Sequence, residues 1–192
     1  MLFPGLQERQ KRGGTMWYVI QTMAGKEQEL VDTIRKMVPP DSYESCFFLK
    51  RQLLKRLGGA WLEITETLFP AYVFVETDKP EEIFFRLKKV PEFTKLLGDT
   101  VEKFIPLEES EQDFLEVLCR NGKAEGQDKL VKLTRVWLGK DGKIDRLDGP
   151  LEYFKEQIAR VNLRKRYAMI EIPLRGEMQT VLLGIRLEKD SI

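Results

Sequence analysis

The spacing of hydrophobic and polar positions predicts a mixed α and β region in the first two thirds of the chain. Continuous apolar and aromatic runs at 16–21 and 69–76 predict buried strands. Apolar positions that repeat every three or four residues predict helices at 24–38 and from Pro80 to 87. A third helix is expected after Pro106, with Phe114, Leu115 and Leu118 as its buried stripe.

Further strand formers lie between these segments. The run at 43–54 is rich in apolar and aromatic residues, and Gly58-Gly59 makes a turn. Polar and apolar residues then alternate at 61–68, as in the returning arm of a hairpin, and a short extended piece is expected at 93–97. The order of these elements predicts an α+β domain of ferredoxin-like character that ends near Arg120.

The remainder of the chain has the pattern of an all-β domain. Residues 121–129 are polar and contain glycine, which is a linker composition. Short β-type runs then recur, separated by turn signals, at 130–138, 157–163, 167–172 and 178–183. We therefore predict a disordered extension (1–15), an α+β domain (16–120), a linker (121–129) and a small β-barrel (130–192).

Charge separates two neighbouring segments of the chain. The 192 residues carry a formal net charge of only +1, but residues 76–122 carry −5 and residues 123–166 carry +5. An acidic block directly before a basic one favours two surfaces with different partners. Chance clustering of charged residues is the alternative explanation.

Several classes of protein are excluded or disfavoured by the composition. The absence of histidine excludes Ser-His-Asp and Cys-His catalysis and histidine-containing zinc sites. No phosphate-binding glycine loop is present, so we expect no enzyme activity, no cofactor and no bound metal. No apolar run is long enough to span a membrane, and the first 15 residues lack the features of a secretory signal. Cys46 and Cys119 form no disulfide framework, which favours the cytoplasm.

A series of short motifs, in a fixed order, resembles the NusG/Spt5 family of transcription elongation factors. In the first domain the series is Trp17-Tyr18-Val19, Gly25-Lys26-Glu27, Phe69-Pro70-Ala71-Tyr72-Val73-Phe74-Val75, Val90-Pro91, Leu97-Gly98 and Pro106. In the second it is Gly142-Lys143-Ile144, Asp148-Gly149-Pro150-Leu151 and Ile158-Ala159-Arg160-Val161. The resemblance spans Met16 to Lys189 and implies an N-terminal NGN domain, with an antiparallel sheet flanked by helices, and a C-terminal KOW β-barrel.

Within the family the chain is most similar to the specialised NusG paralogs, in particular the LoaP antiterminators. Lys89-Val90 stands where pausing-type NusG proteins often have Asn-Thr, and Pro173 replaces an aromatic residue that helps to dock Rho or a ribosomal protein. The resemblance implies a processive antiterminator. The alternative is a housekeeping elongation and termination factor that bridges polymerase to Rho or the ribosome.

The resemblance implies that the first domain binds the clamp helices of RNA polymerase through aromatic side chains. It assigns this role to Tyr18, Phe69 and Tyr72, with Trp17 nearby, and a contact with the opposing polymerase lobe to Phe84, Phe85 and Arg86. Aromatic residues are favoured interface anchors. Both groups have a plainer interpretation, in which the aromatic residues belong to the core and residues 80–87 form an amphipathic helix.

Basic residues of the second domain are candidates for binding a structured nascent RNA leader. They lie at a predicted hairpin turn and in the preceding segments, at Lys143, Arg146, Lys155, Arg160, Arg164, Lys165 and Arg166. Cations of this kind neutralise phosphates and release counterions. A merely solubilising hairpin tip is the alternative. We expect a monomer that does not bind membranes.

A second basic stretch lies in the predicted hairpin of the first domain. Lys50-Arg51 and Lys55-Arg56 are separated by leucine residues. One interpretation is that these cations lie near upstream or non-template DNA. The alternative is an ordinary amphipathic strand.

Overall fold

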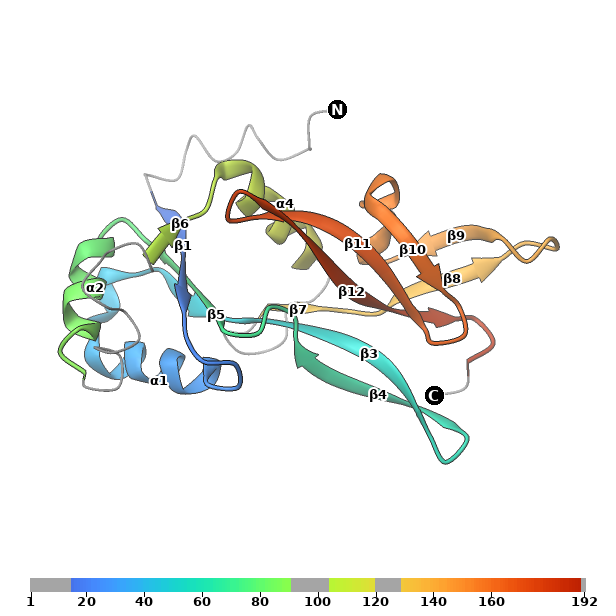
Figure 1. Ribbon diagram of the computed structural model, residues 1–192, viewed down its shortest axis with the longest axis horizontal. Helices are drawn as coiled ribbons and strands as arrows, with labels where there is room; N and C mark the ends of the chain where they lie inside the picture. Colours follow the sequence, from blue (N-terminus) through green and yellow to red (C-terminus); the bar gives the residue numbers. More distant parts are fainter. Residues whose placement is uncertain (1–14, 91–103, 120–128, 191–192) are drawn as a thin grey trace. The chain divides into compact units, whose positions relative to one another are not determined.

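The structure is a computed structural model that describes residues 15–90, 104–119 and 129–190 (Figure 1). The chain divides into two compact units, each built from two segments. The first unit comprises the described parts of Met1–Phe48 and Phe69–Asp113, and the second those of Leu49–Leu68 and Phe114–Ile192. The hairpin segment 49–68 thus groups with the C-terminal part of the chain, unlike in the predicted division. The predicted extension and linker lie outside the described residues, apart from Thr15 and Lys129.

In its described residues the first unit contains an antiparallel sheet in the strand order β2-β5-β1-β6. Its helices are α1, the short 3-10 helix η2, α2 and the first part of α4. The element bounds are β1 (Met16–Gln21), α1 (Glu27–Met37), η2 (Pro40–Ser42), β2 (Ser45–Phe47), β5 (Tyr72–Thr77), α2 (Pro80–Leu87), β6 (Phe104–Pro106) and α4 (Glu109–Cys119).

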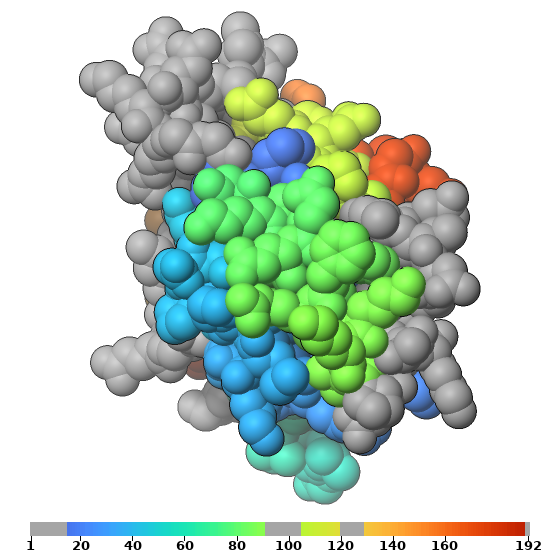
Figure 2. Space-filling view, turned by 90° about the vertical axis from the view of Figure 1, so that its left-hand side faces the viewer, coloured from blue at the N-terminus to red at the C-terminus, as the bar shows by residue number. Residues whose placement is uncertain are grey.

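Helices α1 and α2 supply the core on one face of this sheet. Leu30 and Ile34 lie one helical turn apart in α1, so both point to the same side, and both are fully buried. They pack in one cluster with Val73 and Val75 of β5 and Ile83 of α2. Figure 2 looks onto this part of the unit, where α2 (green) lies beside α1 (blue).

The other face of the sheet carries an aromatic cluster, made of Trp17, Phe47, Phe69, Tyr72 and Phe74. The rings of Phe47 and Phe74 stack with centroids 5.7 Å apart, and Trp17 meets both edge-on. Phe69 reaches Phe74 at 6.2 Å and Tyr72 at 6.5 Å. Edge-on and offset arrangements of this kind are the favourable geometries for aromatic pairs.

The second unit is β-rich. It contains a sheet in the order β10-β11-β12-β8-β9 and a smaller one in the order β4-β3-β7. All pairs are antiparallel except β8 with β12 and β3 with β7. The element bounds are β3 (Leu49–Leu57), β4 (Ala60–Thr67), β7 (Lys129–Val131), β8 (Thr134–Leu138), β9 (Ile144–Asp148), η4 (Pro150–Glu152), η5 (Lys155–Gln157), β10 (Ile158–Asn162), β11 (Tyr167–Leu174) and β12 (Glu177–Leu187).

Strand β3 of the hairpin packs directly against β12. The Arg51 side chain donates a 2.8 Å hydrogen bond to the carbonyl of Leu182, and the side-chain oxygen of Gln52 accepts from the Leu133 N–H at 3.1 Å. Glycine is required at position 184 of β12, because an added Cβ would collide with the Gln52 carbonyl and lie 3.1 Å from the Leu53 Cα. The hairpin is therefore an integral part of the second unit.

Several predicted elements differ in detail from the structure. The run at 43–54 is interrupted at Phe48, and the run at 130–138 at Lys132-Leu133, so each forms two strands. The strand predicted at 69–76 is shorter in the structure: β5 begins only at Tyr72, because Phe69-Pro70-Ala71 form a turn. The predicted extended piece at 93–97 lies outside the described residues.

Two short strands were missed by the sequence pattern. Strand β6 has only three residues, and β9 is mostly exposed, so neither shows the apolar run that marks a buried strand. Arg146, for which the sequence pattern predicts no strand, lies on β9.

The predicted fold class is confirmed. An α+β unit with helices on its sheet and a β-rich C-terminal part are both present. The third helix buries Phe114, Leu115 and Leu118, as the pattern predicted. Both cysteines are free and buried, and burial raises their thiol pKa values to about 12. Among the described helices, none has the length and apolar character needed to cross a membrane.

Candidate nucleic-acid interface

The turn between β10 and β11 presents two of the predicted cations to solvent. The Asn162 side-chain oxygen accepts a 2.9 Å hydrogen bond from the Lys165 N–H, which holds the turn in shape. Arg164 and Lys165 are exposed. Among the described residues, no carboxylate forms an ion pair with either side chain.

Arg166, the next residue, is buried and has a different role. Its Nε and Nη2 donate to both carboxylate oxygens of Asp190, at 2.6 and 2.5 Å, and Nη1 donates to the carbonyl of Leu163. Such two-pronged arginine–carboxylate pairs are the strongest of the common ionic contacts. The Arg166 guanidinium also lies 4.7 Å from the ring centre of Trp61 in β4. Its positive charge is therefore already neutralised by a carboxylate of the protein itself.

Asp190 owes its low pKa to this arrangement. Burial by itself would raise the pKa of the carboxyl, but the hydrogen bonds from Arg166 and from the Leu187 N–H lower it below its usual value of 3.8. The ion pair joins the β10–β11 turn to the end of β12.

The hairpin β3–β4 carries the second basic stretch. Its Gly58-Gly59 turn, with both residues at positive φ, pairs Arg56 with Trp61 across the strands. Lys55 forms a 2.6 Å ion pair with Glu66, and this hydrogen bond is the largest cause of the lowered pKa of Glu66. Arg56 is exposed, with its guanidinium carbon 6.0 Å from the Trp61 ring centre.

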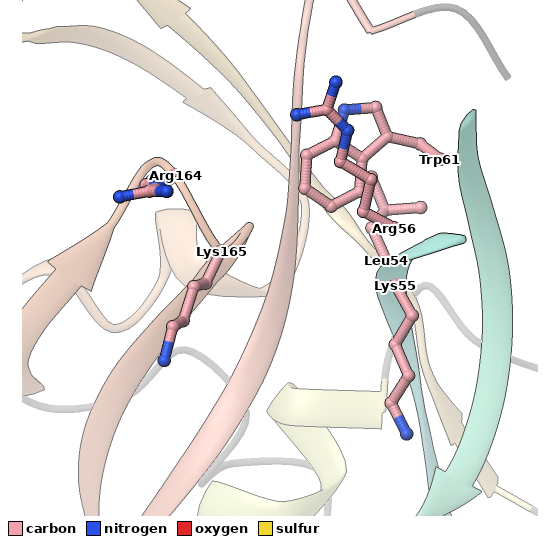
Figure 3. Close-up of a pocket in the computed structure, with 6 residues that line it drawn as sticks. All are labelled: Leu54, Lys55, Arg56, Trp61, Arg164 and Lys165. Carbon is pink, nitrogen blue, oxygen red and sulfur yellow. The ribbon is translucent and has the colours of Figure 1, made fainter. Parts of the chain in front are cut away.

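The hairpin and the β10–β11 turn line a pocket of about 320 Å³ within the second unit, open to solvent (Figure 3). Leu54, Lys55, Arg56 and Trp61 line it from the hairpin, and Arg164 and Lys165 from the turn. Four of the six lining residues are cationic and none is acidic. The structure thus brings together two basic stretches that are about 100 residues apart in the sequence; we call this site the basic pocket.

The remaining predicted cations lie elsewhere on the second unit. Lys143 is exposed in the turn before β9, 4.0 Å from the Asp141 carboxylate. Arg146 stacks 4.8 Å above the Trp137 ring. Lys155 in η5 and Arg160 in β10 are exposed. None of these four residues lines the basic pocket.

The predicted polymerase-binding residues do not share one surface. Trp17 and Phe69 are buried in the aromatic cluster, where Tyr72 is half-buried. Tyr18, by contrast, packs on the helix-covered face, where burial and the nearby Glu81 carboxylate raise its pKa. The two tyrosines therefore lie on opposite faces of the sheet.

Helix α2 matches the amphipathic interpretation. Phe84 is buried in the helix-side core, whereas the Phe85 ring is 60% exposed. The half-buried Arg86 forms hydrogen bonds of 2.9 and 3.0 Å with Glu82, one turn earlier in the helix. Phe85 is the one member of the predicted set with a largely exposed aromatic ring.

Sequence reasoning missed Trp61 and Asp190 as parts of the site. A signal for Trp61 existed, because a two-residue Gly58-Gly59 turn places residues 56 and 61 opposite each other. No local signal pointed to Asp190, whose partner is 24 residues away.

Comparison with known proteins identifies the family. The family model described as "Transcription termination factor nusG" matches residues 15–116, more than half of the chain. The chain belongs to the NusG family. The family predicted from the motifs is thereby confirmed.

Relatives named "Transcription termination/antitermination protein NusG" match over most of their length. The one from Haemophilus influenzae is 23% identical over 171 residues, 87% of this chain and 89% of the relative. The one from Lactococcus lactis is 26% identical over 150 residues, 76% and 78% of the two chains. A solved structure described as "Domain interaction in Thermotoga maritima NusG" covers 89% of this chain and 94% of its own, with 18% identity and a TM-score of 0.45.

Proposed function

We propose that this NusG-family chain is a specialised elongation factor of the LoaP type, which acts as a processive antiterminator. In this proposal the first unit binds the clamp helices of RNA polymerase and the second binds a structured element of the nascent RNA. The observation that carries the proposal is the set of exposed cations on the second unit. Six of the seven predicted RNA-binding side chains are exposed: Lys143, Arg146, Lys155, Arg160, Arg164 and Lys165.

Exposed, uncompensated cations are what phosphate binding requires. Each cation that neutralises a phosphate releases a condensed counterion, which favours binding at low salt. Arg164 and Lys165 fit this role best, since no carboxylate among the described residues pairs with them. Structured RNA is recognised largely through its shape, its phosphates and its 2′-hydroxyls, and a protruding basic turn fits that kind of recognition. We exclude Arg166 from the proposed set because Asp190 neutralises it.

For the polymerase contact we assign the clamp helices to the face of the first unit that carries the aromatic cluster. Tyr72 is its accessible edge and packs on the buried ring of Phe69, whereas Trp17 lies deeper in the cluster against Phe47 and Phe74. Phe85 and Arg86 on α2 are the proposed contact with the opposing lobe. Tyr18 and Phe84 then serve the helix-side core. The cations of the hairpin remain candidates for contact with non-template DNA.

The salt dependence of RNA binding tests the proposal. Replacing both Arg164 and Lys165 with alanine should reduce the slope of log K against log salt by about 1.4 to 1.8, at about 0.7 to 0.9 for each phosphate contact. The matched control replaces Lys132 and Arg135, two other exposed cations of the second unit. Equal slopes for the Arg164/Lys165 variant and the wild type would contradict the assignment.

A housekeeping factor would behave differently in a second assay. Pro173 lies in β11 opposite Met178 of β12, at the position where the family uses an aromatic residue to dock its partner. We therefore expect the full chain to capture neither Rho nor a ribosomal protein. Capture of either partner at micromolar concentration would favour the housekeeping role.

A further inference from the structure

We propose that the basic pocket is a binding site for one unpaired nucleotide, whose base stacks on Trp61 and whose flanking phosphates contact the surrounding cations. The inference rests on the proposed RNA-binding function and adds to it a second element, the hairpin β3–β4. We expect the site to prefer a bulged or looped-out nucleotide to a continuous duplex.

The Trp61 ring is fixed by its neighbours in an orientation that allows stacking. Its ring is only partly buried, and the Arg166 guanidinium lies 4.7 Å from its centre. Arg166 is in turn fixed by both oxygens of Asp190. An aromatic ring that is already immobilised loses little conformational freedom on binding, so more of the stacking energy contributes to affinity.

Arg56 is exposed and lines the pocket, with one 3.3 Å hydrogen bond from its Nε to the carbonyl of Gly59 in the turn. Figure 3 shows its side chain extended alongside the Trp61 indole. The 6.0 Å between its guanidinium carbon and the ring centre is close to twice the roughly 3.4 Å rise between stacked bases. A small movement of this exposed side chain lets a planar base enter between them, and both tryptophan rings and arginine guanidinium planes stack well on bases.

The charge of the pocket selects an anionic ligand. Lys55 has a partner in Glu66, but Arg164 and Lys165 have none among the described residues. Figure 3 shows these two residues on the turn, across the pocket from the hairpin. Both side chains are exposed on this turn, and we assign them to the phosphates next to a base bound at Trp61. The volume of about 320 Å³ is at the lower end of the range of about 300 to 1,000 Å³ of known small-ligand pockets, and the pocket is open to solvent.

The combination of groups argues against a simple anion site. A free phosphate or an acidic peptide would use the cations but not the aromatic ring. A nucleotide uses both, since it joins a planar base to its phosphates. Duplex nucleic acid keeps its bases stacked in the helix, so it would leave Trp61 without a partner.

The test uses the full chain and two RNA hairpins that differ only by one bulged 5-iodouridine. We expect the wild type to bind the bulged RNA about tenfold more tightly than the paired one, as expected for one stacked base. Trp61→Leu should abolish this preference and leave the salt slope unchanged. Ultraviolet cross-linking followed by mass spectrometry should place the iodouridine on the peptide that contains Trp61.

Two further variants keep the test decisive. Trp137→Leu is the matched control, because Trp137 also lies beneath an arginine, Arg146 at 4.8 Å, but outside the pocket. It should retain the tenfold preference. If Trp61→Leu does not fold, as judged by circular dichroism, Arg56→Gln should reduce the preference while leaving the fold intact, since Arg56 is exposed.

The possible outcomes separate the two proposals. Equal wild-type affinity for both hairpins, with a full salt slope, overturns the pocket and leaves RNA binding in place. A preference that survives in both Trp61→Leu and Arg56→Gln also overturns the pocket. The same holds if a polyglutamate peptide competes with the bulged RNA for the protein as well as unlabelled bulged RNA does. A salt slope near zero for any RNA overturns both. The same preference with a bulged DNA hairpin supports the pocket but contradicts RNA as its specific ligand.

Discussion

The two units present their candidate functional residues in opposite ways. In the first unit the aromatic candidates Trp17, Phe69 and Phe84 are buried and belong to its packing. In the second unit the basic candidates are exposed, with Arg166 as the exception. The difference follows from side-chain chemistry, since aromatic rings stabilise a core whereas unpaired cations are costly to bury. Aromatic residues in a sequence motif are therefore expected to lie in the core and stabilise the fold. Cations in a motif are expected to lie on the surface, where they can bind a partner.

The largest expected effect comes from the exception in the second unit. Arg166→Ala should lower the free energy of unfolding by about 3 to 5 kcal/mol, because it leaves the buried Asp190 carboxylate without its partner. Urea unfolding measures the change. The neighbouring Arg164→Ala is the control and should stay within about 0.5 kcal/mol. A loss for Arg166→Ala no larger than the control's would remove the distinction between the two arginines.

A comparable effect is expected in the first unit. Phe69→Ala should destabilise the protein by about 3 kcal/mol, since it removes a buried ring that contacts Phe74 and Tyr72. The exposed Phe85→Ala should cost much less, within about 0.5 to 1 kcal/mol. Thermal unfolding followed by circular dichroism distinguishes them.

The same comparison sharpens the polymerase assignment. Tyr72→Ala should weaken polymerase binding by about 2 kcal/mol, roughly thirtyfold, while the protein stays folded, because the ring is only half-buried. Binding of a folded Tyr72→Ala variant at wild-type strength would mean that the polymerase contact lies elsewhere.

A moderate effect is expected where the hairpin meets β12. Gly184→Ala should destabilise the protein by about 1 to 3 kcal/mol, because its Cβ collides with the Gln52 carbonyl. Thr180→Ala, at an exposed position of the same strand, is the control. Should Gly184→Ala be as stable as the control, the hairpin would not pack on β12 in solution.

The smallest expected effect is a change of stability with pH. The folded pKa of Asp190 lies below its usual value of 3.8, so the ion pair stabilises the protein above about pH 4 and loses that contribution as pH falls through the folded pKa. The difference in unfolding free energy between the wild type and Asp190→Asn should therefore shrink between pH 5 and 2. A constant difference over that range would show that the charge on Asp190 contributes nothing.

Much of the fold could be predicted because periodicity is a local property. The buried stripe of α4 and the Gly58-Gly59 hairpin both followed from neighbouring residues. The exposed strand β9 lacks an apolar run and could not be recognised. The basic pocket was beyond prediction for another reason: residues 54–61 and 164–165 meet only through the packing of β3 on β12.

The most direct test of the proposed function is terminator readthrough in vitro with purified RNA polymerase. Two templates are compared, one that encodes the leader RNA and one in which that leader is scrambled. The wild type should raise readthrough only on the intact leader, and the variant with alanine at Arg164 and Lys165 should lose that increase while still binding polymerase. Equal readthrough on both templates would contradict an antiterminator that is recruited through RNA.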